Sequence, residues 1–143
     1  MTMFVLDASV AVKWFLPPEH ERLTAEALAL LKKFVQADVG FIVPDLFWAE
    51  IGSAFWKAIR LGRFDEASSK GAFRYLAACD LPVYPTFALL DKAFDIANTY
   101  ERSVYDSLYV ALAMETKSQL ITGDERLANA LAAHFPVKWL GAI

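Results

Sequence analysis

The stretch MFVLDASVAVKWFLPP, residues 3–18, decides the fold. Its first four residues form a short apolar run, which is typical of a buried strand. Asp7 follows at once, and residues 9–16 then predict a short helix that Pro17 and Pro18 end. The chain therefore opens with a strand that leads directly into a helix.

The same alternation continues to the end of the chain. Strands are predicted at residues 3–6, 41–43, 82–84, 119–122 and 137–140, and helices at 9–16, 21–36, 45–62, 65–79, 86–101, 103–113 and 125–133. Asp45 and Thr86 are the expected N-caps of two of these helices, and Gly62 is an expected stop signal. Alternating strands and helices predict an α/β fold, namely a three-layer α/β/α sandwich around a mostly parallel sheet of about five strands. The length suits one domain over residues 1–143.

Composition narrows the functional classes. The chain has 14 basic and 17 acidic residues, which argues against non-specific electrostatic binding of nucleic acid along the protein surface. It does not argue against a local site that binds nucleic acid through a metal ion. The single cysteine, Cys79, excludes an internal disulfide, argues against a thiolate metal site, and favours a reducing, cytoplasmic location. The N-terminus lacks the basic start of a signal peptide, and no apolar stretch is long enough to span a membrane.

The chain also contains more hydrophobic residues than an ordinary globular protein. Hydrophobic residues make up 57% of it, and residues 47–56 carry four large aromatic side chains at helical spacing. This helix is expected to contribute to the core or to an interface rather than to base stacking. Some apolar surface is therefore expected to be covered by a partner or by a second copy of the chain.

Two carboxylates follow predicted strands, where a doubly wound sheet binds its ligands. Asp7 comes directly after the first strand, and Asp124 comes two residues after the fourth, in LITGDERL. Each also has a purely structural interpretation as the N-cap of the helix that follows it.

Glu50 interrupts the apolar face of the helix predicted over residues 45–62. No Lys or Arg lies three or four residues from it, so the helix itself offers no partner. A lone buried carboxylate is protonated or costly. Either this face is partly wet, or a base from another element pairs with Glu50, or Glu50 belongs to a site.

Asp106 lies in the first turn of the helix predicted in SVYDSLYVALA, residues 103–113. In one interpretation Ser103 caps the helix and Asp106 reaches back to the Ser103 amide, forming a capping box. In the other, Asp106 is a metal ligand. Four acids at neighbouring strand ends and helix starts would repel one another unless a cation lay among them. A ligand set of oxygens, without Cys or paired His, suits Mg²⁺ or Mn²⁺, which orient and activate water for attack on a phosphate.

The motifs FVLDASV, YDSLYVALA and LITGDERL, with the acid at position 50 in the third helix, together resemble the signature of PIN-domain ribonucleases. They are most similar to the VapC-type toxins of bacterial and archaeal toxin–antitoxin pairs, and the resemblance covers essentially the whole chain. It implies an endoribonuclease that uses Mg²⁺ or Mn²⁺ to cleave single-stranded or looped RNA, and a homodimer held inactive by a small antitoxin. The catalytic and metal-binding acids that it implies are Asp7, Glu50, Asp106 and Asp124.

The resemblance also implies that the hydroxyls of Ser9 and Thr122 brace the site. Lys13, Arg102 and Arg126 lie near the acids in sequence, and they are either phosphate contacts or ordinary solvated charges. The remaining candidates, His20 and His134, have neither metal-ligand spacing nor Cys partners and are expected to be structural or on the surface.

Other functional classes fit the sequence less well. A phosphatase of the haloacid-dehalogenase type needs a second Asp two residues after the strand-end Asp, where this chain has Ser9. A receiver domain needs an Asp at the end of its middle strand, and LPVYPT offers none. Phosphate-binding glycine loops are absent. Two alternatives stay open: a PIN-like RNA-processing nuclease without an antitoxin, and a catalytically silent module that only binds a partner.

Overall fold

The computed structural model describes all residues, 1–143, and contains five strands and seven α-helices. The strands are β1 (Thr2–Leu6), β2 (Val39–Pro44), β3 (Val83–Tyr84), β4 (Gln119–Thr122) and β5 (Val137–Trp139). The helices are α1 (Ala8–Ala11), α2 (Thr24–Val35), α3 (Leu46–Arg60), α4 (Glu66–Ala78), α5 (Leu90–Tyr100), α6 (Val104–Thr116) and α7 (Glu125–Leu131). Single 3-10 turns lie at Val12–Trp14, Pro18–His20, Thr86–Leu89 and Leu140–Ala142. No helix combines the length and the apolar character that crossing a membrane requires.

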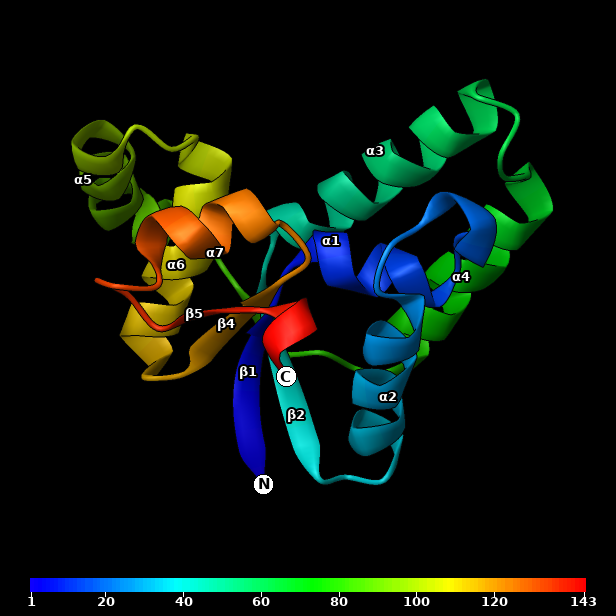
Figure 1. Cartoon of the computed structure of the whole chain (residues 1–143), viewed down its shortest axis with the longest axis horizontal. Helices are drawn as coiled ribbons and strands as arrows, with labels where there is room; N and C mark the ends of the chain where they lie inside the picture. Colours follow the sequence, from blue (N-terminus) through cyan, green and yellow to red (C-terminus); the bar gives the residue numbers. More distant parts are fainter.

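All five strands are parallel and form one sheet in the order β3-β2-β1-β4-β5 (Figure 1). In the central strand β1, Val5 lies opposite Ile42 of β2 on one side and Leu120 of β4 on the other. The chain builds one half of the sheet outward from β1 and then returns to the opposite edge of β1 to build the other half. This reversal makes the β1/β4 boundary the topological switch point, beside which open α/β sheets bind ligands.

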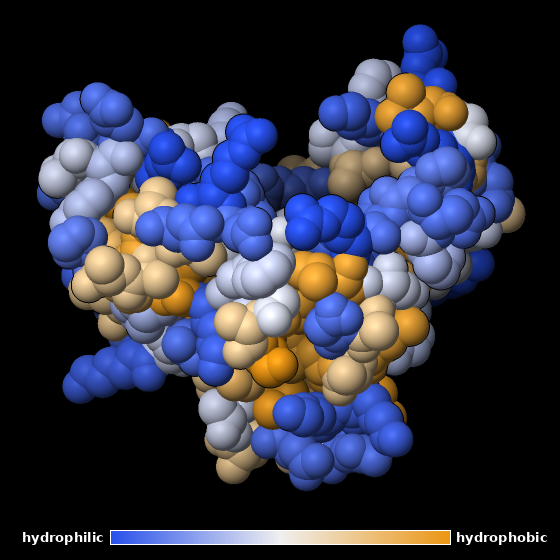
Figure 2. All heavy atoms as spheres, in the orientation of Figure 1, coloured by the Kyte–Doolittle hydropathy of each residue, from blue (hydrophilic) through white to orange (hydrophobic).

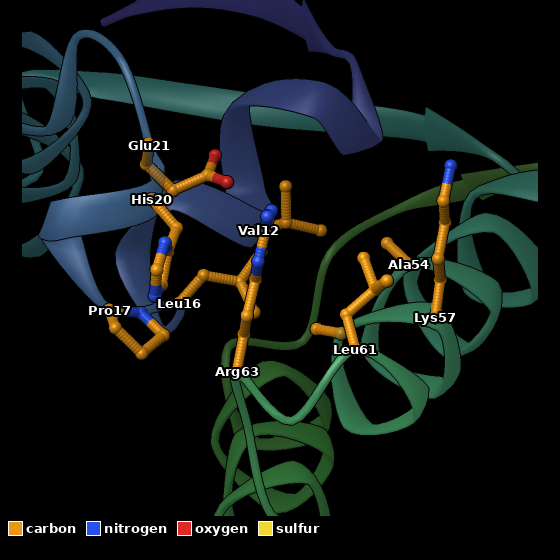
Figure 3. A pocket seen from close by; sticks show the side chains of 10 residues that line it. Val12, Leu16, Pro17, His20, Glu21, Ala54, Lys57, Leu61 and Arg63 are labelled. Atoms are coloured by element: carbon orange, nitrogen blue, oxygen red, sulfur yellow. The ribbon is translucent and has the colours of Figure 1, made fainter.

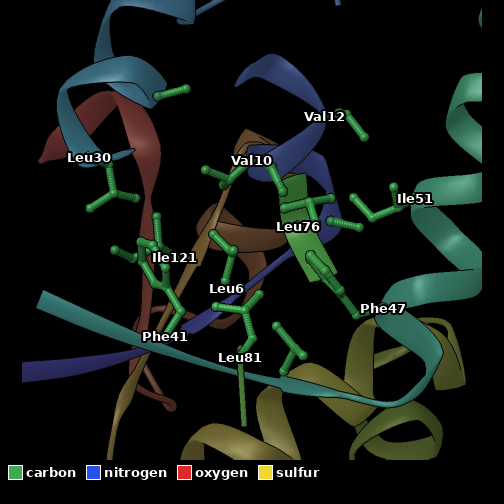
Figure 4. Packing of buried hydrophobic residues seen from close by; sticks show 14 of the residues in the cluster. Leu6, Val10, Val12, Leu30, Phe41, Phe47, Ile51, Leu76, Leu81 and Ile121 are labelled. Atoms are coloured by element: carbon green, nitrogen blue, oxygen red, sulfur yellow. The ribbon is translucent and has the colours of Figure 1, made fainter. Parts of the chain in front are cut away.

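A hydrophobic core covers each face of the sheet. Val5 and Leu120 pack into the core formed with α5, α6 and α7, whereas Leu6 and Ile121 pack into the core formed with α1 to α4 (Figure 4). Successive residues of a strand point to opposite faces, so strands buried on both sides read as continuous apolar runs. The predicted three-layer sandwich with a parallel sheet is confirmed.

The predicted N-cap Thr86 is wrong, and Asp45 lies at the N-cap position of α3 without capping it through its side chain. The helix predicted at 86–101 begins as a 3-10 turn and becomes α5 only at Leu90, and the Thr86 side chain does not cap it. The Thr86 amide donates instead to Asp45 Oδ1 at 3.3 Å, and Asp45 makes no capping bond to α3. The helix predicted at 9–16 is likewise split into α1 and the 3-10 turn Val12–Trp14. The ends of the other predicted elements agree with the structure to within three residues.

Gly62 ends α3 as predicted. Its φ of +70° lies in the left-handed region, which favours glycine. Two hydrogen bonds close the helix here, from the Gly62 amide to the Ile59 carbonyl (3.0 Å) and from the Arg63 amide to the Ala58 carbonyl (2.9 Å). The turn that results leads into α4, which the Asp65 carboxylate caps.

Candidate active site

The four predicted acids, Asp7, Glu50, Asp106 and Asp124, line one pocket of about 230 Å³. Asp7 follows β1 and Asp124 follows β4, on either side of the switch point. Glu50 comes from α3 and Asp106 from the first turn of α6, so the two helical layers each contribute one acid. Figure 2 shows the surface hollowed between these two groups of helices.

Asp7 is the most enclosed of the acids, with 7% of its surface exposed. Its Oδ1 accepts a hydrogen bond from the Ser9 amide (3.3 Å), so Asp7 caps α1, and its Oδ2 accepts one from the Thr122 hydroxyl (2.7 Å). Burial raises the pKa of Asp7, the bonds from Thr122 and Ser9 oppose that effect, and the charge of Asp106 adds to it. The capping role and the position in the pocket are therefore compatible.

Two hydroxyls tie the ends of β1 and β4 together. The Thr122 hydroxyl, which donates to Asp7, also accepts a bond from the Asp124 amide at 3.0 Å. The Ser9 hydroxyl accepts a bond from the Gly123 amide at 2.9 Å. The bond between Thr122 and Asp7 and the bond between Gly123 and Ser9 join residues more than 110 positions apart in sequence, and Ser9 and Thr122 thus brace the strand ends as expected.

Asp124 caps α7. Its Oδ1 accepts hydrogen bonds from the amides of Arg126 (3.0 Å) and Leu127 (3.3 Å). Its Oδ2 forms no hydrogen bond with the protein, so one oxygen is available in the pocket while the other holds the helix.

Glu50 is half-buried, and its Oε1 accepts a 2.7 Å hydrogen bond from the hydroxyl of Tyr109 on α6. The alternative in which a base pairs with Glu50 is wrong, because the one ion pair in the chain joins Lys13 to Glu21 (3.3 Å). Burial raises the pKa of Glu50, and the charges of Asp7 and Asp106 add to it. Burial also raises the pKa of Tyr109, so this phenol remains a hydrogen-bond donor.

Sequence reasoning missed Tyr109, although two signals were present. Tyr109 lies three residues after Asp106, which places both on one side of α6. It is also a tyrosine within an apolar helix, and the hydroxyl of a buried tyrosine needs a hydrogen-bond partner.

Asp106 is half-buried in the first turn of α6, where the Ser103 hydroxyl accepts a bond from the Asp106 amide at 3.0 Å. Ser103 is therefore the N-cap, as predicted. The Ser103 amide does not donate back to the Asp106 carboxylate, so only half of a capping box is formed. Burial raises the pKa of Asp106 and the charge of Asp124 adds to it, while Ser103 and Arg102 oppose the shift.

The pocket has the chemistry of a site for a hard cation. Its only ionisable lining groups are the four carboxylates, and burial raises the pKa of three of them, so a cation would relieve the cost of their ionisation. No three Asp, Glu, His or Cys side chains lie close enough together to ligate one ion directly. That spacing suits Mg²⁺, which keeps several of its waters and takes only one or two carboxylates as direct ligands. The residues present therefore fit a hydrated divalent cation.

The nearby basic residues are arranged in different ways. Lys13 is buried and paired with Glu21, so it is not a solvated charge. Arg102 is half-buried and donates through Nε to the Glu101 carbonyl (3.2 Å), and Arg126 is exposed. Neither histidine lines the acid pocket, since His20 borders a neighbouring pocket and the ring of His134 lies 5.4 Å from that of Tyr100.

Comparisons with known proteins point to one family. Residues 4–131 match the family model described as PIN domain. The chain is 29% identical over 133 residues to ribonuclease VapC3 of Pyrobaculum aerophilum, covering 90% of this chain and 95% of the relative. It is 28% identical over 137 residues to ribonuclease VapC9 of Mycobacterium tuberculosis, covering 94% of this chain and 96% of the relative.

Solved structures share the fold. The crystal structure of PAE2754 from Pyrobaculum aerophilum superposes with a TM-score of 0.71 at 22% identity, over 99% of this chain and 85% of the other. The structure of VapBC2 from Rickettsia felis, bound to a DNA fragment from its promoter, gives a TM-score of 0.65 at 12% identity, over 96% of this chain and 98% of the other.

Proposed function

Because this chain belongs to the PIN domain family, we propose that it is an endoribonuclease that needs Mg²⁺ or Mn²⁺ and cuts single-stranded or looped RNA. The observation that carries the proposal is that four acids from four separate elements line one pocket at the switch point. Two relatives named as VapC ribonucleases, each matching 90% or more of this chain, support the activity.

The toxin role and the partners belong to the same proposal. A small antitoxin is the proposed protein partner, supported by the VapBC2 structure that shares this fold. A homodimer is supported by large apolar side chains on the surface, among them Phe87 (86% exposed) and Phe94 (59% exposed). With RNA as substrate, the proposed place of action is the cytoplasm. Light scattering of the protein alone and with a co-expressed antitoxin would test both associations.

The four acids would hold the cation directly or through its waters, and when bound it would polarise the phosphodiester and lower the pKa of a water. The chain's own residues fix the geometry. The Thr122 bonds hold Asp7 and the Asp124 backbone in place, and the Tyr109 hydroxyl holds Glu50 Oε1. Glu50 Oε2 forms no hydrogen bond with the protein and is available to take a proton from the attacking water.

The reaction proposed for this site is hydrolysis. The water oxygen bonds to phosphorus, the bond from phosphorus to O3′ breaks, and the O3′ leaving group takes up a proton. The products are a 5′-phosphate and a 3′-hydroxyl. Analysis of the product ends therefore separates this chemistry from attack by the RNA 2′-hydroxyl, which leaves a 2′,3′-cyclic phosphate.

The variant Asp106→Asn tests the proposal directly. Helix α6 keeps its cap, because Ser103 accepts from the amide of residue 106 and not from its side chain. The circular dichroism spectrum should therefore stay native, while cleavage of a looped RNA in Mg²⁺ or Mn²⁺ should fall by orders of magnitude. Asp95→Asn makes the same chemical change at an exposed position of α5. It is the matched control and should cut RNA as the parent does. Full activity of Asp106→Asn, full activity of the parent in chelator, or a cyclic phosphate product would contradict the proposal.

The same assay separates the two remaining alternatives. A silent partner-binding module predicts that the parent protein cuts no RNA with any divalent metal. A nuclease without an antitoxin predicts cleavage that no small co-expressed partner inhibits.

A further inference from the structure

A second pocket, of about 250 Å³, adjoins the acid pocket (Figure 3). Val12 and Ala54 line both pockets, so the two are continuous. The lining of the second pocket is largely apolar and includes Leu16, Pro17 and Leu61. A ligand bound at the acids can therefore extend into a mainly apolar space without leaving the protein surface.

The charge of the second pocket is opposite to that of the first. Lys57 and Arg63 line it, both are exposed, and neither forms an ion pair. Its one carboxylate, Glu21, is already paired with Lys13 at 3.3 Å. Figure 3 shows the side chains of Lys57 and Arg63 extending in the same direction, from α3 and from the turn that follows it. Lys57 and Arg63, which form no ion pair, therefore lie next to the acid pocket.

Helix α3 connects the two pockets. Glu50, Ala54 and Lys57 are spaced by four and three residues, which places them on one face of the helix, and Leu61, directly after the last residue of α3, continues this spacing. At about 1.5 Å per residue, Lys57 lies roughly 10 Å farther along the helix axis than Glu50, and Leu61 roughly 16 Å. A polymer that follows this face therefore meets a carboxylate first, then a cation, then an apolar surface.

We propose that the second pocket is a nucleotide subsite for the RNA segment that flanks the cleaved linkage. The apolar lining takes a base, and Lys57 and Arg63 hold the phosphate next to it. This inference rests on the proposed ribonuclease function and adds the path of the substrate. The unpaired cations favour a polyanion, which supplies negative charge to both of them, over a protein segment without acidic side chains, which supplies none.

A binding measurement tests the phosphate contacts. The probe is a short, fluorescently labelled single-stranded RNA, and its anisotropy is followed with protein that carries Asp106→Asn to prevent cleavage. The added double substitution Lys57→Gln/Arg63→Gln should weaken binding about tenfold at low salt. It should also reduce the slope of log affinity against log salt by about 1.4, since each single-strand phosphate contact contributes about 0.7.

The matched control removes two charges elsewhere. Arg74 and Lys92 are exposed, form no ion pair and line neither pocket, and they lie on α4 and α5. The double variant Arg74→Gln/Lys92→Gln has the same net charge as the test variant. It should bind the probe with the parent affinity and the parent salt slope.

A second variant tests the base contact separately. Leu61→Ser should weaken binding of the same probe while leaving the salt slope unchanged, because the lost contact releases no counterion. Leu28, on α2 and similarly exposed (45% against 56% for Leu61), supplies the control Leu28→Ser. In cleavage assays with Asp106 intact, Lys57→Gln/Arg63→Gln should raise KM while kcat stays within about twofold, since neither cation touches the reacting atoms.

The outcomes distinguish this inference from the proposed function. If the parent cuts RNA while the pocket variants bind and cut as it does, the subsite is overturned and the nuclease stands. If those variants keep parent RNA affinity but lose a co-expressed protein partner, the pocket takes a protein segment and the subsite is likewise overturned. A parent protein that neither binds nor cuts RNA overturns the proposed function, and the subsite with it.

Discussion

The hydroxyl of Tyr109 donates a 2.7 Å hydrogen bond to Glu50 Oε1, and this bond joins α6 on one face of the sheet to α3 on the other. Tyr109 is 1% exposed and packs in the core of α5, α6 and α7, so its position is fixed by its surroundings. Glu50, in contrast, is half-buried and lines the pocket. The buried tyrosine therefore sets the position of Glu50 Oε1.

Removing this hydroxyl should affect activity more than stability. We expect Tyr109→Phe to change the free energy of unfolding by at most about 1 kcal/mol, because one hydrogen bond to a half-exposed acceptor is lost. RNA cleavage should fall about tenfold, since Glu50 is no longer held. Tyr105→Phe is the control, because Tyr105 is on the same helix but 65% exposed. Parent-level cleavage by Tyr109→Phe would show that Glu50 needs no support.

Thr122 should matter most for stability. Thr122→Val leaves both a buried carboxylate oxygen of Asp7 and the Asp124 amide without their partner. We expect a loss of about 2–3 kcal/mol in urea unfolding, and Thr122→Ser should restore most of it. The Thr116 hydroxyl bonds only to a carbonyl of its own helix, at Leu112 (2.8 Å), so Thr116→Val should cost much less. Equal losses in the two valine variants would rule out a special role for Thr122.

Asp7 should make the metal-free protein less stable as pH rises. Its pKa is raised above the ordinary 3.8, so the folded chain retains a proton that the unfolded chain has already lost. The free energy of unfolding therefore falls as pH rises from 3.8 to the folded-state pKa and stays low above it. In chelator at pH 7, Asp7→Asn should melt at a higher temperature than the parent, and the difference should close below pH 3.8.

In Mg²⁺, the parent should melt at a higher temperature than Asp7→Asn, the opposite of the order expected in chelator. Metal at about 100 times its Kd adds roughly 2.7 kcal/mol to the stability of a protein that binds it only when folded. The parent should gain this stability, and Asp7→Asn should gain less. Identical responses of the two proteins to Mg²⁺ in thermal melts would exclude Asp7 from the metal site.

Gly123 is required by close packing beneath the pocket. A Cβ at this position would lie 3.0 Å from Lys13 Cε and 3.1 Å from the Ser9 carbonyl oxygen, which belongs to the backbone and cannot move freely. Gly123→Ala should therefore displace the loop that carries Asp124, costing about 1 kcal/mol of stability and a larger fraction of activity. Gly71→Ala is the control. A Cβ there meets no atom within 4 Å, so this variant should be more stable than the parent by about 0.5–1 kcal/mol.

Local sequence was sufficient for the elements that depend on local chemistry. β1 and β4 were predictable because consecutive apolar residues, Val5-Leu6 and Leu120-Ile121, are buried on opposite faces of the sheet. Ser103 and Gly62 were predictable because a helix cap and a left-handed turn each need a particular residue type within one turn of the helix end. The acids that follow β1 and β4 were predicted because, in a parallel sheet, the carboxyl ends of neighbouring strands lie side by side.

The errors concern contacts between distant segments. Asp45 and Thr86 have the composition of caps, but they bond to each other across 41 residues of sequence. One expectation for Glu50 was a base from another element, and its partner is instead a phenol 59 residues away. The periodicity of one helix contains no information about which side chain from a helix on the other face of the sheet will contact it.

The order of the strands has a consequence for synthesis on the ribosome. Asp7 is synthesised 115 residues before Thr122, its hydrogen-bond partner at the end of β4, and β4 itself pairs with β1. A nascent or prematurely terminated chain that ends before β4 lacks one wall of the pocket and the bonds that hold Asp7. The pocket is therefore complete only after residues 119–124 have left the ribosome and joined the sheet beside β1.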